Sequence, residues 1–444
     1  MRNPTEMAKN AEIFICLIVT VSVVLLYIVN KCFLNTEILE DPGDYSWIIH
    51  GIRNILGYAT VFVPGFLVYK YVVNTNYLNK SGRGVFGAVI RTCFGEDELL
   101  LVNTNPHSGT NQRTPLQDCC LLLFYFCGLQ ISYLSWGVLQ EKVMTQKYEN
   151  SDKEVGYFKD SQFLVFVNRI LAFLTAAIIL FCTKQPRHRC PLYKYMYCSL
   201  SNIMSSWCQY EALKYVSFPH QVLAKASKTI PVMIMGKLVS KTKYEFYEYV
   251  TAVILSIGML LFMIDTGNDR SNSTVTTFSG VILLCSYIAF DSFTANWQGK
   301  LFKQYEMKPL QMMCFVNFFS CIFTLVSLLQ QSSFMKSLEF MIKFPQFIVD
   351  AVLLSLCSAG GQLFIFNTVS TFGPLVFVII STVRQGFSVL LSCVIYKHHV
   401  SAVGIFGVCL VFFSMLLRAY CGYRIKTLKQ FHLQSGMSNV KSEK

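Results

Sequence analysis

The segment LQMMCFVNFFSCIFTLVSLLQ, residues 310–330, contains no Asp, Glu, Lys or Arg. About 20 consecutive, mostly apolar residues are enough for a helix to span the hydrocarbon core of a bilayer. The rest of the chain has the same character: of its 444 residues, 53% are hydrophobic and only 14% are charged, whereas a soluble chain carries about 25% charged residues. This composition excludes a string of soluble domains and predicts an all-α polytopic membrane protein.

Twelve apolar runs divide the chain. Two of them, residues 13–34 and 48–73, are followed by a polar stretch at 74–117, rich in Gly, Asn and Thr, which is predicted to be a cytosolic loop. Ten closely spaced runs follow. The predicted parts are an N-terminal extension (1–117), a first five-helix repeat (118–266), a second five-helix repeat (277–421) and a basic cytosolic tail (422–444). The ten runs are 118–141, 162–183, 193–216, 219–239, 247–266, 277–298, 310–330, 347–368, 374–396 and 402–421.

The ten-run series contains an internal repeat. In each half, a Ser-containing segment ends at a glutamine (Gln209 or Gln362), a Val-Ser pair follows seven residues later, and a proline-led run then carries a cation (Lys228 or Arg384). The copies lie five runs apart, an odd number, so they have opposite orientations in the membrane. Inverted repeats with a site between them are a transporter architecture. Chance similarity between apolar helices is the alternative.

The charges between the runs predict the orientation. Lys and Arg gather at 184–194, 237–243, 300–308 and 418–429, and acidic residues gather at 37–44. By the positive-inside rule, both termini are cytosolic. The sequon at Asn272 then lies in a luminal turn and is a glycosylation candidate, while the sequon at Asn79 is cytosolic.

The net charge of +13 is dispersed among these segments rather than gathered on one basic face, so nucleic acid is not an expected partner. Many of the 17 Cys lie inside apolar runs and no CxxC pair occurs, which is typical of small buried hydrophobes. We find no P-loop, no H-E-x-x-H, no G-x-S-x-G and no paired metal-ligand cluster. We therefore expect neither an enzyme nor a cofactor.

Cations inside the runs are the strongest candidate site residues. Gln221, Lys225 and Lys228 form a stripe at i, i+4 and i+7 of one predicted helix. Like charges on one face of a membrane helix cost several kcal/mol unless something neutralises them. Either acids of the chain pair with them, the main ones being Glu141, Glu211 and Asp291, or the partner is an anionic ligand.

Weaker candidates complete the predicted site. The planar guanidinium of Arg384 is suited to a bidentate contact with a phosphate or sulfate. The alternative is that Arg384 holds a helix in place by pairing with an acid. Asn317 and Gln362 could bind a base or ribose, although amides also hold transmembrane helices together. Glu141 could orient one of the lysines or merely cap a helix. Arg169, early in its run, is expected near the membrane interface.

Several longer strings carry a family resemblance: QPRH at 185–188, SNIMSSWCQYEALKYVSFP ending at Pro219, QVLAKASKTIPVMIMGKLVS from Gln221, YIAFDSFTANWQ from Tyr287 and GQLFIF from Gly361. They resemble the Golgi transporters of 3'-phosphoadenosine 5'-phosphosulfate (PAPS), in the nucleotide-sugar transporter group of the drug/metabolite transporter superfamily. The resemblance implies secondary-active antiport of PAPS from the cytosol into the Golgi lumen, for sulfation, in exchange for an adenosine nucleotide. The basic positions of that family match Lys225, Lys228 and Arg384.

Charge supports the same substrate class. PAPS carries about four negative charges, which three cations would match better than they match a neutral sugar. If those cations lacked partners, an empty site would reorient poorly, which predicts strongly preferred exchange. The alternatives are a UDP-sugar transporter and a non-transporting membrane scaffold. The bilayer is an expected partner; the sequence leaves the oligomeric state open, a homodimer included.

Overall fold

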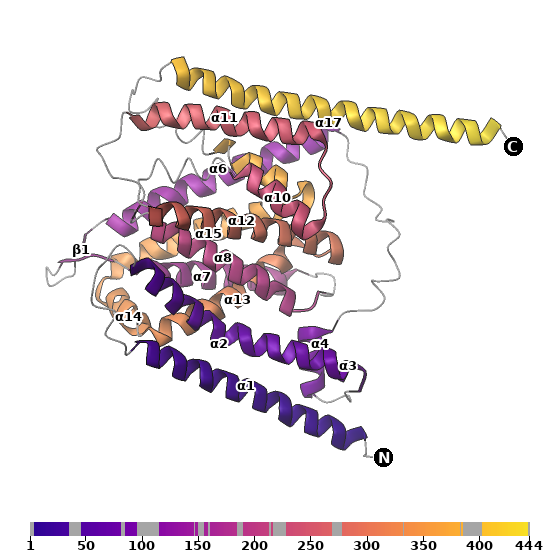
Figure 1. Cartoon of the computed structure of the whole chain (residues 1–444). Coiled ribbons are helices and arrows are strands. Elements are labelled where there is room, and N and C mark those ends of the chain that lie inside the picture. The colour runs from indigo at the N-terminus through magenta and orange to yellow at the C-terminus, as the bar shows by residue number, and fades with distance from the viewer. Residues whose placement is uncertain are drawn as a thin grey trace. The chain divides into compact units, whose positions relative to one another are not determined.

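The structure is a computed structural model that describes residues 4–34, 46–80, 85–95, 115–145, 147–149, 155–158, 160–183, 190–212, 215, 228–268, 278–331, 333–381, 383–384 and 402–442. Helices make up nearly all of this part, with one two-stranded hairpin (Figure 1). Eight of the described helices are long and apolar enough to cross a membrane. The predicted all-α polytopic class is confirmed, and twelve spans stay a prediction.

The described chain divides into two compact units. Unit 1 comprises 1–211 and 293–374, and unit 2 comprises 212–292 and 375–444. Unit 1 contains α1 (Pro4–Leu34), α2 (Ser46–Thr75), α3 (Tyr77–Lys80), α4 (Val85–Phe94), α6 (Pro115–Thr145), β1 (Tyr148–Glu149), β2 (Val155–Gly156), α7 (Ser161–Cys182), nearly all of α8 (Tyr193–Ala212), the second part of α12 (Phe278–Tyr305), α13 (Pro309–Gln330), α14 (Ser333–Lys343) and α15 (Pro345–Phe372). Unit 2 contains α10 (Thr229–Ser240), α11 (Phe246–Asn268), the first part of α12 and α17 (Ala402–Ser442).

Local sequence sets the helix boundaries. Asp160 caps α7, because its carboxylate accepts hydrogen bonds from the Gln162 and Phe163 amides at 3.1 Å. Proline occupies the first position of both α13 and α15, where its missing N–H costs nothing. Helix α15 ends at Gly373, whose φ of 88° is a conformation that glycine adopts without strain.

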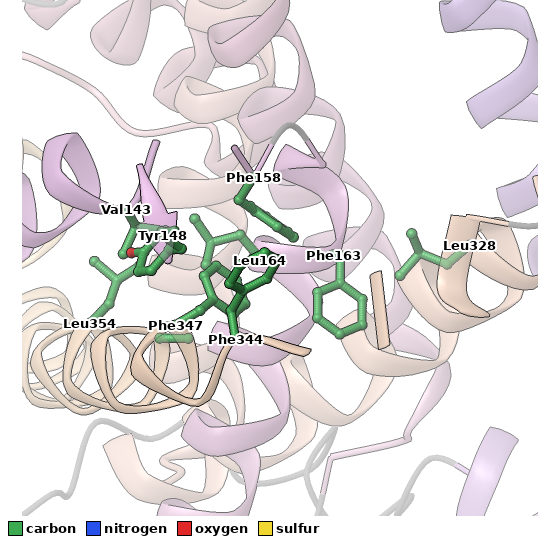
Figure 2. Close-up of a cluster of buried hydrophobic side chains, with 10 residues drawn as sticks. Val143, Tyr148, Phe158, Phe163, Leu164, Leu328, Phe344, Phe347 and Leu354 are labelled. Carbon is green, nitrogen blue, oxygen red and sulfur yellow. The ribbon is translucent and has the colours of Figure 1, made fainter. Parts of the chain in front are cut away.

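Aromatic side chains build a core of unit 1 beside the hairpin. Figure 2 shows this hairpin cluster, in which Tyr148, Phe158, Phe163, Phe344 and Phe347 converge from the hairpin, α7 and α15. The Tyr148 hydroxyl donates to Asp350 Oδ2 at 3.2 Å, and Asp350 also pairs with Lys142 Nζ at 2.8 Å. Burial, followed by the neighbouring carboxylate, raises the pKa of Tyr148, so the phenol stays protonated and donates. The hairpin is thereby fixed to α6 and α15.

Amides hold the first two helices against α13. Asn30 of α1 donates to Gln330 Oε1 at 2.6 Å, and Gln331 donates to Asn54 Oδ1 of α2 at 2.7 Å. Such contacts hold membrane helices together where the lipid supplies no hydrophobic force between them. The N-terminal helix pair is therefore an integral part of unit 1.

The predicted loop at 74–117 is partly wrong. In its described part the chain forms α3 and α4 (Figure 1). Ile90 of α4 is buried with Tyr77 and Val72, and Phe86 and Phe94 pack against the same cluster. The spacing of Phe86, Ile90 and Phe94 is helical, so burial of one apolar stripe overrides the polar composition of the stretch. Residues 96–114 lie outside the described part.

Helices α11 and α17 lie side by side in unit 2 (Figure 1). Arg418 Nη2 lies 3.0 Å from Glu248 Oε1, and the Ser414 hydroxyl donates to the Thr251 carbonyl at 2.8 Å. A Cβ atom placed on Gly258 would lie 2.8 Å from the Gly407 carbonyl oxygen. The close approach of the two backbones therefore requires glycine at position 258.

Candidate functional site

Lys228 sits at the start of α10, where its carbonyl accepts the first hydrogen bond of the helix, from the Val232 amide at 3.0 Å. Only 6% of the residue is exposed. Helix α10 covers the second part of the predicted run 219–239, so the structure places Lys228 at a helix start rather than within a described helical stripe. Gln221 and Lys225 lie outside the described residues.

A carboxylate neutralises Lys228. Its Nζ lies 3.2 Å from Asp291 Oδ2 of α12, and both residues belong to unit 2. The side chains are 8% and 32% exposed, respectively. The Phe377 ring also faces the ammonium group, with its centroid 5.7 Å from Nζ. The expectation that Lys228 lacks a carboxylate of its own is therefore wrong: of the two alternatives open from the sequence, internal pairing is the one observed.

The physical reason is the cost of a buried charge. An ammonium group removed from water without compensation is strongly destabilised, so a counter-ion within the same unit is favoured. Asp291 supplies it from the Tyr287–Gln298 string. The ion pair is asymmetric, because the lysine is almost fully enclosed while about a third of the aspartate side chain is accessible.

Arg384, the corresponding cation of the second repeat, also belongs to unit 2 and is partly exposed. Glu141 lies in α6 of unit 1, but its side chain is outside the described part. The glycosylation candidate Asn272 is outside the described residues. In the described part of the chain, no group of three or more His, Cys, Asp or Glu could hold a metal ion.

The structure brings Asn317 and Gln362 together, in unit 1. Asn317 is fully buried, and its amide nitrogen donates to Gln362 Oε1 at 2.7 Å and to the Met313 carbonyl at 2.8 Å. Asn317 Oδ1 in turn lies 3.5 Å from Nη1 of Arg169 of α7. From the sequence, Arg169 was expected only near the membrane interface; its charge inside an apolar run was the available signal.

Two polar centres result, one in each unit. In unit 2, a buried ammonium group is paired with an accessible carboxylate. In unit 1, a guanidinium contacts a buried amide oxygen. Cations and amides are groups that recognise phosphate, sulfate and nucleobase atoms. Neither centre has the donor set of a metal site or of a nucleophile with its base.

Comparison with known proteins agrees with a transport role. The model of the UAA transporter family matches residues 121–422. The chain is similar to a Drosophila melanogaster protein named adenosine 3'-phospho 5'-phosphosulfate transporter 1, with 49% identity over 96% of this chain and 97% of that protein. A Homo sapiens protein of the same name is 51% identical over 86% of this chain and 88% of its own length. An Arabidopsis thaliana protein named UDP-galactose/UDP-glucose transporter 5 is 37% identical over 71% and 91%.

The family match covers most of the chain, and the two animal relatives match nearly their full lengths. The family is one of transporters, which confirms the prediction that the chain is not an enzyme. The chain is a multi-pass membrane protein that belongs to the UAA transporter family.

Proposed function

We propose that this chain carries PAPS from the cytosol into the Golgi lumen in exchange for an adenosine nucleotide, by alternating access. Relatives at about half identity over most of the chain are named as transporters of this nucleotide. The observation that carries the proposal within the chain itself is Lys228, a nearly enclosed cation whose carboxylate partner is accessible. Such a pair can open to an anion of the charge that PAPS bears.

Asp291 has a defined part in this mechanism. When the site is empty, the carboxylate neutralises Lys228 at 3.2 Å. When nucleotide enters, a phosphate or sulfate oxygen takes the place of the carboxylate, and Asp291 turns toward water. The ammonium group thus keeps a negative partner in both conditions, which avoids the cost of an unpaired buried charge.

With Lys228 paired in the empty carrier, a cation without a partner no longer explains why exchange would be preferred over net uptake. An empty carrier with Lys228 paired internally is able to reorient, but it must first close the ion pair. A carrier that holds product already has its charge balanced. We therefore propose that exchange is faster than net uptake, rather than that net uptake is forbidden.

The orientation belongs to the same proposal. Both termini face the cytosol, as the Lys and Arg distribution favours, and the protein resides in the Golgi membrane. Protease protection of terminal epitope tags in sealed Golgi vesicles tests this directly. Tags digested without detergent support the proposal, while tags digested only after detergent treatment contradict it.

A UDP-sugar is the second candidate substrate, because the Arabidopsis thaliana relative is named for UDP-galactose and UDP-glucose. The two candidates differ in charge and in base. Purified chain in proteoliposomes should take up labelled PAPS, with inhibition by unlabelled PAPS and by adenosine 3',5'-bisphosphate. Stronger inhibition by UDP-galactose or UDP-glucose than by these adenine nucleotides would favour the second candidate.

A further inference from the structure

Arg169 is held by amides from two neighbouring helices. Its Nη1 lies 3.5 Å from Asn317 Oδ1 of α13. The Asn202 amide of α8, with its oxygen turned toward the guanidinium, accepts from Nη1 at 3.2 Å and from Nη2 at 3.3 Å. All of these residues belong to unit 1. The contacts fix the plane of the guanidinium, and they bring hydrogen bonds without adding negative charge.

A second layer fixes the amides. The Asn317 amide nitrogen is occupied by Gln362 Oε1 at 2.7 Å and by the Met313 carbonyl at 2.8 Å, so its oxygen is turned toward Arg169. Asn317 is fully buried and 8% of Gln362 is exposed. One residue before Arg169, the Asn168 oxygen accepts from the Ser355 hydroxyl at 2.7 Å, which joins α7 to α15. The guanidinium is thereby preorganised on rigid helices.

The depth of Arg169 is unusual for a cation. It lies within the apolar span 162–182, about 10 Å along the helix from the first residue of that span, at 1.5 Å per residue. Intramembrane cations are costly and mark substrate or ion pathways. Arg169 itself is partly exposed, whereas Asn317 beneath it is buried.

An unused hydroxyl lies one helical turn from Asn317. Ser320 of α13 is fully buried, and within the described chain its Oγ has no hydrogen-bond partner. A buried polar atom without a hydrogen-bond partner destabilises the folded protein. A polar ligand group within hydrogen-bond distance of Ser320 Oγ would remove that cost.

We propose that Arg169 is a further substrate-binding residue, whose guanidinium contacts a phosphate or sulfate group of the transported nucleotide. Asn202, Asn317 and Gln362 act as positioning residues that hold the guanidinium. Nη1 and Nη2, which both donate to the Asn202 oxygen, lie in one plane, and two such donors match two oxygens of a phosphate or sulfate group that displaces this amide. The inference rests on the proposed function and assigns a substrate-binding residue to unit 1.

Proteoliposomes with purified chain provide the test. Saturable PAPS uptake by the unmodified chain must be seen first, since its absence contradicts the proposed function rather than this inference. Arg169→Gln should then raise the KM for PAPS about tenfold or more, as expected for loss of a charge-assisted contact. Arg91→Gln, which removes an exposed arginine of α4, is the matched control and should leave KM unchanged.

Competition separates binding from a merely structural role. Inhibition by adenosine 3',5'-bisphosphate should weaken in Arg169→Gln, while inhibition by uncharged adenosine should not. If inhibition by adenosine 5'-monophosphate weakens to the same extent in Arg169→Gln, Arg169 contacts the 5' group. If that inhibition does not weaken, Arg169 contacts the 3' phosphate. A lower maximal rate with unchanged KM and unchanged inhibition constants would overturn the inference.

A second variant keeps the inference testable if Arg169→Gln does not fold. Asn202→Asp exchanges one amide nitrogen for oxygen and places a carboxylate beside the intact guanidinium, which supports folding through a new ion pair. The carboxylate competes with the nucleotide, so the KM for PAPS should rise by about tenfold. A folded Asn202→Asp protein with the unmodified KM would overturn the inference.

Discussion

Asp291→Asn should tighten nucleotide binding while weakening the empty protein. The substitution keeps the size of the side chain and removes the charge that neutralises Lys228. At 3.2 Å and an effective dielectric constant of about 20, the attraction between the two charges is about 5 kcal/mol before desolvation. Desolvation and the partial exposure of Asp291 reduce the net value to about 1.5–3 kcal/mol. A nucleotide that displaces the carboxylate must overcome this net attraction.

The expected result is a Kd for PAPS about tenfold to a hundredfold lower than in the unmodified chain, because each tenfold corresponds to about 1.4 kcal/mol. Binding is measured by titration in detergent, and stability by thermal unfolding with and without nucleotide. The empty variant should unfold at a lower temperature, and nucleotide should raise its Tm by more than it raises that of the unmodified chain.

Glu248→Gln is the matched control, since it breaks an ion pair of similar length, 3.0 Å to Arg418, in the same unit. It should lower the Tm without changing the Kd for PAPS. The reasoning would be refuted if Asp291→Asn left both the Kd and the nucleotide-dependent rise in Tm unchanged, or if it abolished binding in a folded protein. The latter result would mean that Asp291 itself binds the substrate.

Three further predictions test other parts of the account. Lys228→Ala should abolish PAPS uptake in a folded protein, while Lys308→Ala, which removes an exposed side chain at the start of α13, should leave uptake normal; equal uptake by both would move the site elsewhere. Gly258→Ala should lower the stability by about 1–3 kcal/mol, measured as a reduced Tm, because the new methyl group meets the Gly407 carbonyl at 2.8 Å, and an unchanged Tm would contradict that close approach. Asp350→Asn should lower the Tm, because it weakens the hydrogen bond from Tyr148 and the ion pair with the half-exposed Lys142. The expected loss of stability is about 1–2 kcal/mol after solvent screening. The KM for PAPS should stay unaltered, and a changed KM would place Asp350 in the transport site.

The sequence predicted the fold class because apolar runs of spanning length need no tertiary information. It also singled out Lys228, since a cation inside such a run is costly wherever the helix packs. The pairing with Asp291 could only be an alternative, because the two residues are 63 positions apart and their approach depends on how α10 and α12 pack. The sequence named the correct acid among three without fixing the contact.

Other features were beyond prediction for similar reasons. The Arg169 cluster joins residues that are far apart in the chain and reach one place only in the folded unit. The apolar stripe Phe86, Ile90 and Phe94 was present in the sequence. The surrounding Gly, Asn and Thr nevertheless favoured a loop, because the helix that carries the stripe has only ten residues. The close approach of Gly258 and Gly407 could not be predicted either, because it depends on how two helices pack and not on the sequence of either helix alone.

Uptake of labelled PAPS into proteoliposomes tests the central claim most directly, with vesicles either empty or preloaded with adenosine 3',5'-bisphosphate. The account predicts saturable uptake that is faster into preloaded vesicles and is lost in Lys228→Ala. Uptake no greater than in protein-free vesicles, with a chain that remains folded and is correctly inserted, would contradict it.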